Sequence, residues 1–543
     1  MQTTQIKASI SCSPGRRSFL LLPLVLALFG LAPAPNVFGV VPAPDGGYPG
    51  GNTAEGDSAL FHLTTGVDNT AVGDFALFNN TTANDNTAIG FEALVDNVTG
   101  SNNTAIGFSA LISNETGSNN TASGMSALFS NDIGHENTAT GAVALFSNTA
   151  GSENTATGAS TLFSNTTGSA NTANGASALQ SNTIGSVNTA NGTAALQNNT
   201  TGSANTANGA NALLLNTTGN NNTANGASAL QNNTTGTANT ANGVDTLLNN
   251  TTGKNNTADG AQALNNNTTG INNVGFGVNA LLFNTTGNLN VALGFNSLLQ
   301  NITGDNNTAQ GVNALSNNTV GNNNTANGRA ALLRNTTGSS NIALGVNAGG
   351  NLTTGNSNID IGNAGVSAEA NTIRVGTQGI QRRAFIAGIS GTAVTGSPVV
   401  VNASGQLGVA ASSERFKDEI KPMNRASEAI LALQPVTFRY KKNIDPQGAP
   451  QFGLVSEEVA KVDPDLVARD ADGKVYSVRY DAVNAMLLNE FLKEHRKLEE
   501  LTKEFHAAIA QQRKQIETLS AGLHKVSAQL EVSEPAPQVV NNP

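Results

Sequence analysis

The chain has 543 residues, of which 58 are glycine and none is tryptophan, and only 12% are charged and 4% aromatic. So few large side chains exclude a series of ordinary globular cores, while 38% hydrophobic residues exclude a solvated disordered chain. The net charge of −10 argues against a nucleic-acid partner. A repetitive architecture that buries small residues remains.

Residues 1–34 are typical of a signal peptide. Basic residues precede the apolar run 19–32, which is too short to span a bilayer and ends in small residues that suit cleavage. An uncleaved N-terminal anchor is the alternative, and residues 15–20 also resemble a twin-arginine signal. The single cysteine, Cys12, lies in this segment, so the mature chain would lack disulfides. We expect a secreted or cell-surface protein with no transmembrane anchor.

A repeat of 17 residues occupies residues 52–365. Glycine recurs in this register from Gly56 to Gly362, asparagine four residues earlier from Asn52 to Asn358, and leucine four residues later from Leu60 to Leu332. The unit reads approximately NTAxGxxALxxNTTGxx. A register kept without insertion over this length predicts a solenoid or another repeat architecture.

The unit predicts one coil of a parallel β-solenoid. Asn-Thr-Ala-x-Gly alternates as a short strand does, with alanine inward and threonine outward. Ala-Leu would form a second short strand, and Asn-Thr-Thr-Gly a turn in which glycine or asparagine takes positive φ. The asparagine that begins each unit would stack as a hydrogen-bonded ladder.

Each coil offers a core only one leucine and two alanines, so we expect additional burial against partner chains. Residues 154–244 contain no charged side chain, which suits a rigid stalk better than an enzyme cleft. His62 and His135 stand alone without metal-ligand spacing, and no carboxylate pair recurs in register. We therefore expect no metal and no cofactor.

Units such as Asn86–Gly90, Asn103–Gly107 and Asn290–Gly294 resemble the head repeats of trimeric autotransporter adhesins. The resemblance implies a trimeric β-roll and a surface role. This unit has three more residues than the usual adhesin repeat, and no membrane barrel follows it, so self-secretion is not implied. An ice-binding or other surface-binding solenoid is the alternative, with the threonine row Thr53–Thr325 as its face.

The composition changes after the repeats. Residues 366–411 predict a β-rich neck, 412–487 a small α+β domain, and 533–543 a disordered tail. Residues 488–532 predict a trimeric coiled coil, with one long helix packed on its own domain as the alternative. The a and d positions of its heptads would be Leu488, Phe491, His495, Leu498, Thr502, Phe505, Ile509, Gln512, Ile516, Leu519, Leu523, Val526 and Leu530.

Four segments carry a second resemblance: Ser412–Met423, Ile430–Lys441, Phe452–Val467 and Val478–Glu494. They are similar to the C-terminal intramolecular chaperone of phage endosialidases and tail fibres, a self-cleaving peptidase family. The resemblance implies a domain that trimerises, assists folding of the β-rich fibre before it and cuts itself off at its own start.

The family motif at the cut is Ser-Asp-x-Arg-x-Lys, and this chain has Ser412, Arg415 and Lys417 in it, with Ser413 in place of the aspartate. The resemblance implies cleavage between Ala411 and Ser412, with Ser412 as nucleophile and Lys417 as base. Arg415 would supply positive charge or stabilise the oxyanion. On one helix Ser412 and Lys417 would lie roughly 140° apart, so either Ser412 precedes the helix or the lysine comes from a neighbouring chain. Alternatively, Ser412 or Ser413 only caps the helix.

The sequence thus predicts a homotrimeric, adhesin-like fibre that chaperones its own assembly and then cleaves itself. A host surface, extracellular matrix or glycan receptor is compatible with it as a further partner. A structural fibre that does not cleave is the alternative.

Overall fold

The structure is a computed structural model that describes residues 48–532 except 382, 388, 390–393, 403 and 471. The expected signal peptide, 1–34, and the tail, 533–543, lie outside the described residues. The chain divides into two compact units between Thr377 and Gln378. Each unit is described by itself.

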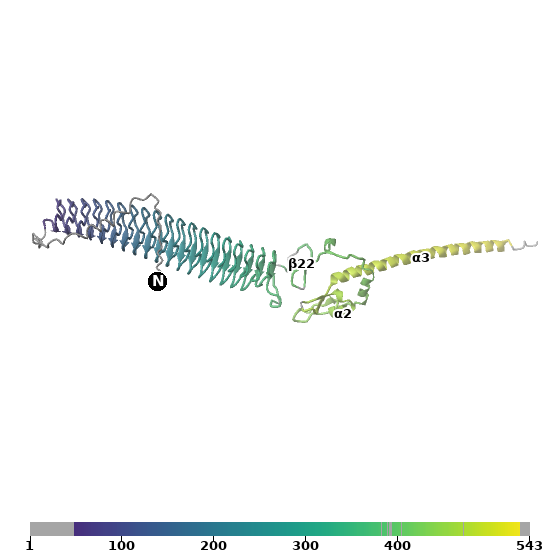
Figure 1. Ribbon diagram of the computed structural model, residues 1–543. Helices are drawn as coiled ribbons and strands as arrows, with labels where there is room; N and C mark the ends of the chain where they lie inside the picture. Colours follow the sequence, from purple (N-terminus) through teal and green to yellow (C-terminus); the bar gives the residue numbers. More distant parts are fainter. Residues whose placement is uncertain are drawn as a thin grey trace, which may run out of the picture. The chain divides into compact units, whose positions relative to one another are not determined.

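The first unit is a stack of coils, each of which contributes one three-residue strand to a single 20-stranded sheet (Figure 1). Every strand pairs in parallel with the next along the chain, so Thr53 lies beside Thr70 and Ala54 beside Ala71. The predicted parallel β-solenoid is confirmed. The strands are β1 Thr53–Glu55, β2 Thr70–Val72, β3 Thr87–Ile89, β4 Thr104–Ile106, β5 Thr121–Ser123, β6 Thr138–Thr140, β7 Thr155–Thr157, β8 Thr172–Asn174, β9 Thr189–Asn191, β10 Thr206–Asn208, β11 Thr223–Asn225, β12 Thr240–Asn242, β13 Thr257–Asp259, β14 Val274–Phe276, β15 Val291–Leu293, β16 Thr308–Gln310, β17 Thr325–Asn327, β18 Ile342–Leu344, β19 Ile359–Ile361 and β20 Ile373–Val375.

The prediction of a second strand in each coil is wrong. The Ala-Leu segment forms consecutive turns, because its leucine and the residue two before it both have left-handed backbone: in one coil Phe75 has φ 60° and Leu77 has φ 51°. The segment still bonds to the next coil, since the Leu77 N–H donates to Ala93 O at 3.0 Å. Positive φ also falls on the glycine of Asn-Thr-Ala-x-Gly, and not on the glycine of Asn-Thr-Thr-Gly.

Two asparagine rows, and not one, run through the core. In the predicted row, Asn188 donates from its backbone N and from Nδ2 to Asn171 Oδ1, at 3.0 and 3.1 Å. The second row comes from the Asn-Thr-Thr-Gly turn, where Asn199 Nδ2 donates to Asn182 Oδ1 at 2.7 Å and to Gly202 O at 2.8 Å. Both rows are fully buried beside two alanines and a leucine per coil. Because the amides are bonded, apart from the Oδ1 of Asn335 at the end of the second row, their burial is tolerated.

Replacement of Asn199 by alanine is expected to lower the free energy of unfolding by about 3 kcal/mol. The substitution removes the bonds to Asn182 and Gly202 and leaves Asn216 Nδ2, which donates to Asn199 Oδ1 at 2.7 Å, without that acceptor. Asn198→Ala is the control, since the half-buried Asn198 takes no part in either ladder. Thermal unfolding of the two variants checks this, and equal losses would contradict it.

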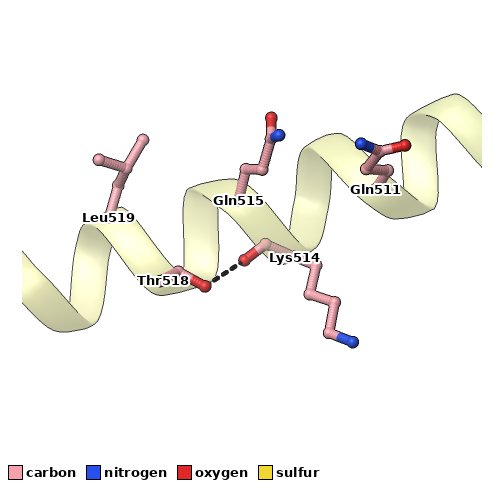
Figure 2. Close-up of a pocket in the computed structure, with 5 residues that line it drawn as sticks. All are labelled: Gln511, Lys514, Gln515, Thr518 and Leu519. Atoms are coloured by element: carbon pink, nitrogen blue, oxygen red, sulfur yellow. Dashed lines mark hydrogen bonds between the residues drawn. The ribbon is translucent and has the colours of Figure 1, made fainter.

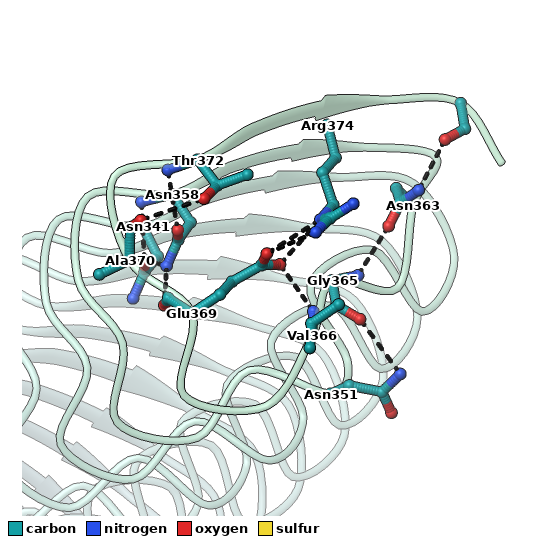
Figure 3. A network of polar contacts seen from close by, with 11 residues as sticks. Asn341, Asn351, Asn358, Asn363, Gly365, Val366, Glu369, Ala370, Thr372 and Arg374 are labelled. Atoms are coloured by element: carbon teal, nitrogen blue, oxygen red, sulfur yellow. Dashed lines mark hydrogen bonds and ion pairs between the residues drawn. The ribbon is translucent and has the colours of Figure 1, made fainter. Parts of the chain in front are cut away.

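The last coil closes the stack with a different polar network (Figure 3). Arg374 donates from Nε and Nη2 to the carboxylate of Glu369, and Glu369 Oε1 accepts from the backbone N of Val366 at 2.6 Å. Asn358 continues the ladder by donating from Nδ2 to Asn341 Oδ1 at 3.0 Å, and the same Nδ2 donates to Glu369 O at 2.8 Å. Asp360 occupies the inward alanine position and is only 1% exposed, and neither of its carboxylate oxygens has a hydrogen-bond partner. The sheet thus extends through β20, past residue 365.

The closing coil is expected to be more stable in mild acid than at neutral pH. Burial, and secondly the charge of Glu369, raises the pKa of Asp360 from 3.8 to about 6. The stabilising contribution of the protonated carboxyl is therefore complete below pH 3.8 and is lost as pH rises through about 6. Asp360→Asn should stabilise the coil by about 1–2 kcal/mol at pH 7. Hydrogen exchange of residues 359–376 between pH 4 and 8 checks this, and an unchanged pH profile in the variant would contradict it.

The second unit begins with a β-hairpin, β21 Val399–Val401 and β22 Leu407–Val409, and continues as a small α+β fold. Its core contains Val459, Leu466, Val467, Val478 and Met486. The remaining elements are the 3-10 helices η1 Glu414–Phe416, η2 Asn424–Ala432 and η3 Pro464–Leu466, the antiparallel pairs β23 Val436–Phe438 with β24 Gln451–Gly453 and β25 Val467–Arg469 with β26 Val475–Val478, and the helices α2 Ser456–Val462 and α3 Tyr480–Glu531.

Candidate functional site

The structure brings Ser412 and Lys417 together within one chain. Ser412 precedes η1, whose three residues are followed by Lys417 in extended conformation, with φ −128° and ψ 132°. Because the chain reverses over η1, Lys417 Nζ comes to lie 3.4 Å from Ser412 Oγ. Of the two arrangements considered for the pair, the one in which Ser412 lies before the helix is present. Their separation slightly exceeds the ~2.6–3.2 Å at which a general base takes a proton, a contact that commonly shortens only in the reactive complex.

In the part of the chain that the structure describes, the side chains of Ser413 and Arg415, which lie between Ser412 and Lys417 in the sequence, make no hydrogen bond to either of the two. Ser413 is the N-cap of η1 by position, but its side chain makes no capping hydrogen bond. The guanidinium carbon of Arg415 lies 4.5 Å from the centre of the Phe416 ring. Among the described residues no hydrogen bond joins Arg415 to Ser412 or Lys417, so the single chain does not place Arg415 at the dyad.

Both members of the dyad are exposed in the single chain. A lysine accepts a proton only in its neutral form. Exclusion of water favours that form, and so does the presence of another positive charge nearby. A serine–lysine pair can therefore act as nucleophile and base only if something covers it. The fold of a single chain brings the serine hydroxyl and the lysine amine close together. A second chain that covers them would exclude water from the pair.

A second polar cluster, which joins η2 to α3, was not anticipated from the sequence. Ser427 is fully buried and donates from Oγ to Glu490 Oε1 at 2.5 Å, while Asn489 Nδ2 donates to Ser427 Oγ at 2.6 Å. Lys493 Nζ lies 2.6 Å from Glu490 Oε1 and 3.6 Å from Glu428 Oε1. The Lys493 ammonium, and then the Ser427 hydroxyl, hold the pKa of Glu490 below its ordinary value. This cluster ties the start of the long helix to the domain, and its partners lie too far apart in sequence to form a motif.

Beyond the domain, α3 carries an exposed apolar row. Phe491, Leu498, Phe505 and Leu519, at predicted a and d positions, are 62–70% exposed in the single chain. A shallow hollow farther along is lined by Gln511, Lys514, Gln515, Thr518 and Leu519, all from this one helix (Figure 2). The long helix is present and starts at Tyr480, before the expected residue 488. Its apolar row is the kind of surface that a coiled-coil partner covers.

The serine of this site is the first residue of a segment that matches a known protein family. Residues 412–468 match the family described as the chaperone of endosialidase. No match to a curated protein is found. The match to the chaperone of endosialidase begins at Ser412 itself, the serine that lies beside Lys417, and it ends in β25. The resemblance to this chaperone is thereby confirmed over residues 412–468. The segment Val478–Glu494 lies beyond the match, and the adhesin-like likeness of the repeats stays an expectation.

No group of three or more histidine, cysteine or acidic side chains in the described part of the chain is arranged to hold a metal ion. The lone histidines have local partners: His135 Nδ1 lies 3.0 Å from Ser152 Oγ, and His495 Nε2 lies 3.4 Å from Glu499 Oε1. None of the described helices has both the length and the hydropathy of a membrane span.

Proposed function

We propose that this chain is an exported homotrimeric fibre whose C-terminal domain first aligns the three chains and then cuts itself off between Ala411 and Ser412. The observation that carries the proposal is the family match beginning at Ser412, where Lys417 Nζ lies 3.4 Å from Ser412 Oγ. The solenoid, with its small side chains and many uncharged coils, serves as the rod that the domain assembles.

In the proposed reaction, Ser412 Oγ attacks the carbonyl carbon of Ala411 while Lys417 accepts the hydroxyl proton. The bond between the Ala411 carbonyl carbon and the Ser412 nitrogen breaks, and the proton passes from Lys417 to the released amine. Water then hydrolyses the ester formed at Ser412 Oγ, which leaves a carboxylate at Ala411 and restores the serine. Arg415 is assigned a supporting role, reached by turning away from Phe416 when the chains assemble.

Cleavage of this kind would follow assembly. The dyad is exposed in a single chain, and the apolar row of α3 and the exposed valines of β21 supply surfaces with which two other chains can cover it. Mass spectrometry of the purified protein over time after refolding tests the proposal. Fragments that appear only after trimers have formed support it, and fragments that appear in monomer fractions contradict the order of events.

A further inference from the structure

An uncharged stripe runs along the surface of the solenoid at the residue that directly follows the repeat glycine, from Phe91 to Val312, whereas Asp57, Asp74 and Arg329 occupy this position in coils outside that range. From the coil of Gly90 to the coil of Gly311 this position is exposed in every coil, and all but Thr193 are apolar. We call these residues the apolar stripe: Phe91, Phe108, Met125, Ala142, Ala159, Ala176, Thr193, Ala210, Ala227, Val244, Ala261, Val278, Phe295 and Val312. Contiguous exposed apolar surface of this extent is unusual on a protein that works as a monomer.

The neighbouring row, directly before each glycine, continues the same surface. It is apolar toward both ends, with Ile89 and Ile106 at one end and Phe276 at the other, each about 40% exposed. In the middle it is an asparagine ladder, in which Asn174 Nδ2 donates to Asn191 Oδ1 at 2.8 Å and the pattern repeats through Asn242. From residue 72 to residue 242 this row holds no charged residue, and Asp259 is its one charged member beside the apolar stripe. A partner seated on residues 72–242 of this row would therefore bury no unpaired charge.

The dimensions of the stripe indicate what covers it. With coils ~4.8 Å apart, the stripe extends roughly 65 Å, and three residues across a strand edge give a width of about 10 Å. The resulting ~650 Å² of each chain is shared between two neighbours and is smaller than the ~800 Å² that each partner contributes to a standard two-chain interface, so the stripe adds to the association of the C-terminal domain and does not replace it. A partner must match a ~4.8 Å spacing over the whole length, and a second stack of the same coils has that spacing.

We propose that the apolar stripe is the surface along which three copies of this solenoid meet, parallel and in register, around a common axis. This inference rests on the proposed trimer and assigns its rod interface. In register, the bulky Phe91, Phe108 and Met125 of each chain meet the same residues of its partners, and the run Ala142–Ala176 lets the backbones approach closely. A shift by several coils would place phenylalanine against alanine and leave voids.

The test uses a single cysteine in a Cys12→Ser background, which has no other cysteine. Ala176→Cys places a thiol on the stripe, and Thr167→Cys places a thiol at another exposed position, in the Asn-Thr-Thr-Gly turn of the preceding coil. Light scattering first gives the mass of each variant, and a short bismaleimide is then added under native conditions. We expect trimer mass for both and covalent dimers at least fivefold more abundant for Ala176→Cys. Ala210→Cys should behave like Ala176→Cys.

The outcomes separate the two proposals. Trimer mass with cross-links from Thr167→Cys but none from Ala176→Cys or Ala210→Cys would overturn the stripe and leave the trimer standing. Monomer mass for the variants and for the parent protein alike would overturn the trimer and the stripe together.

Discussion

Wild-type protein is expected to separate, once folded, into a rod that ends at Ala411 and a fragment of residues 412–543, whereas Ser412→Ala and Lys417→Ala are each expected to stay full length. The reason is the 3.4 Å approach of Lys417 Nζ to Ser412 Oγ, which places base and nucleophile at the expected cut. Each alanine variant should reduce the cleaved fraction at least a hundredfold. Intact mass and N-terminal sequencing of the smaller fragment provide the measurement.

Two further substitutions define the roles. Ser413→Ala should cleave normally, because the side chain of Ser413 makes no capping hydrogen bond, and Lys417 Nζ lies beside the hydroxyl of Ser412. Lys417→Arg should stay intact, since a guanidinium keeps the charge and cannot accept the proton. Wild-type trimers that never cleave would refute the peptidase and leave the chaperone, and loss of cleavage in Ser413→Ala would mean that the nucleophile is misassigned.

Deletion of residues 412–543 before expression is expected to yield aggregated or monomeric rod. The coils resemble one another so closely that three chains can pair in many shifted registers, and an independent C-terminal assembly is needed to fix the correct one. Size-exclusion chromatography with light scattering measures the result. A soluble trimer of the truncated chain would contradict the chaperone role.

Two single substitutions on α3 test the association of the chains without deleting the domain. Leu519→Asp introduces charge into the exposed apolar row, while Gln515→Asp changes a nearby polar residue of the same helix (Figure 2). We expect the first to abolish trimers and the second to preserve them. Equal behaviour of the two variants would show that the apolar row of α3 is not where the chains associate.

Periodicity predicted the parts of the fold that depend on one residue type recurring in register. The unbroken 17-residue spacing fixed the parallel pairing of Thr53 with Thr70, and alternation placed alanine inside and threonine outside. The asparagine before each strand was expected to form a ladder, and it does. The spacing of Ser412 and Lys417 likewise required one of two arrangements, and the structure contains the first of them.

The features that the sequence does not predict depend on unusual backbone conformations or on contacts between residues far apart in the chain. The sequence predicts only a turn at Asn-Thr-Thr-Gly and not the second asparagine row. An asparagine before Thr-Thr-Gly suits a turn as well as a buried amide, so the sequence does not separate the two roles. Left-handed leucines are rare enough that apolar Ala-Leu was interpreted as a strand. The Ser427–Glu490 contact joins residues far apart in the sequence, and the position of Asp360 in an alanine row becomes informative only once its burial is known.

The leucine row has a consequence for how the rod comes into being. Leu60 and each of its counterparts through Leu332 hold φ near 50°, a conformation that costs an L-residue roughly 1–2 kcal/mol. A lone coil has that cost but lacks the neighbour whose carbonyl accepts the leucine N–H, so it cannot persist by itself. Only a nucleus of several stacked coils can grow, and growth then proceeds from its ends as in a one-dimensional crystal. A partly ordered rod should therefore contain one continuous ordered block with a sharp boundary at each growing end, and not many scattered loose coils.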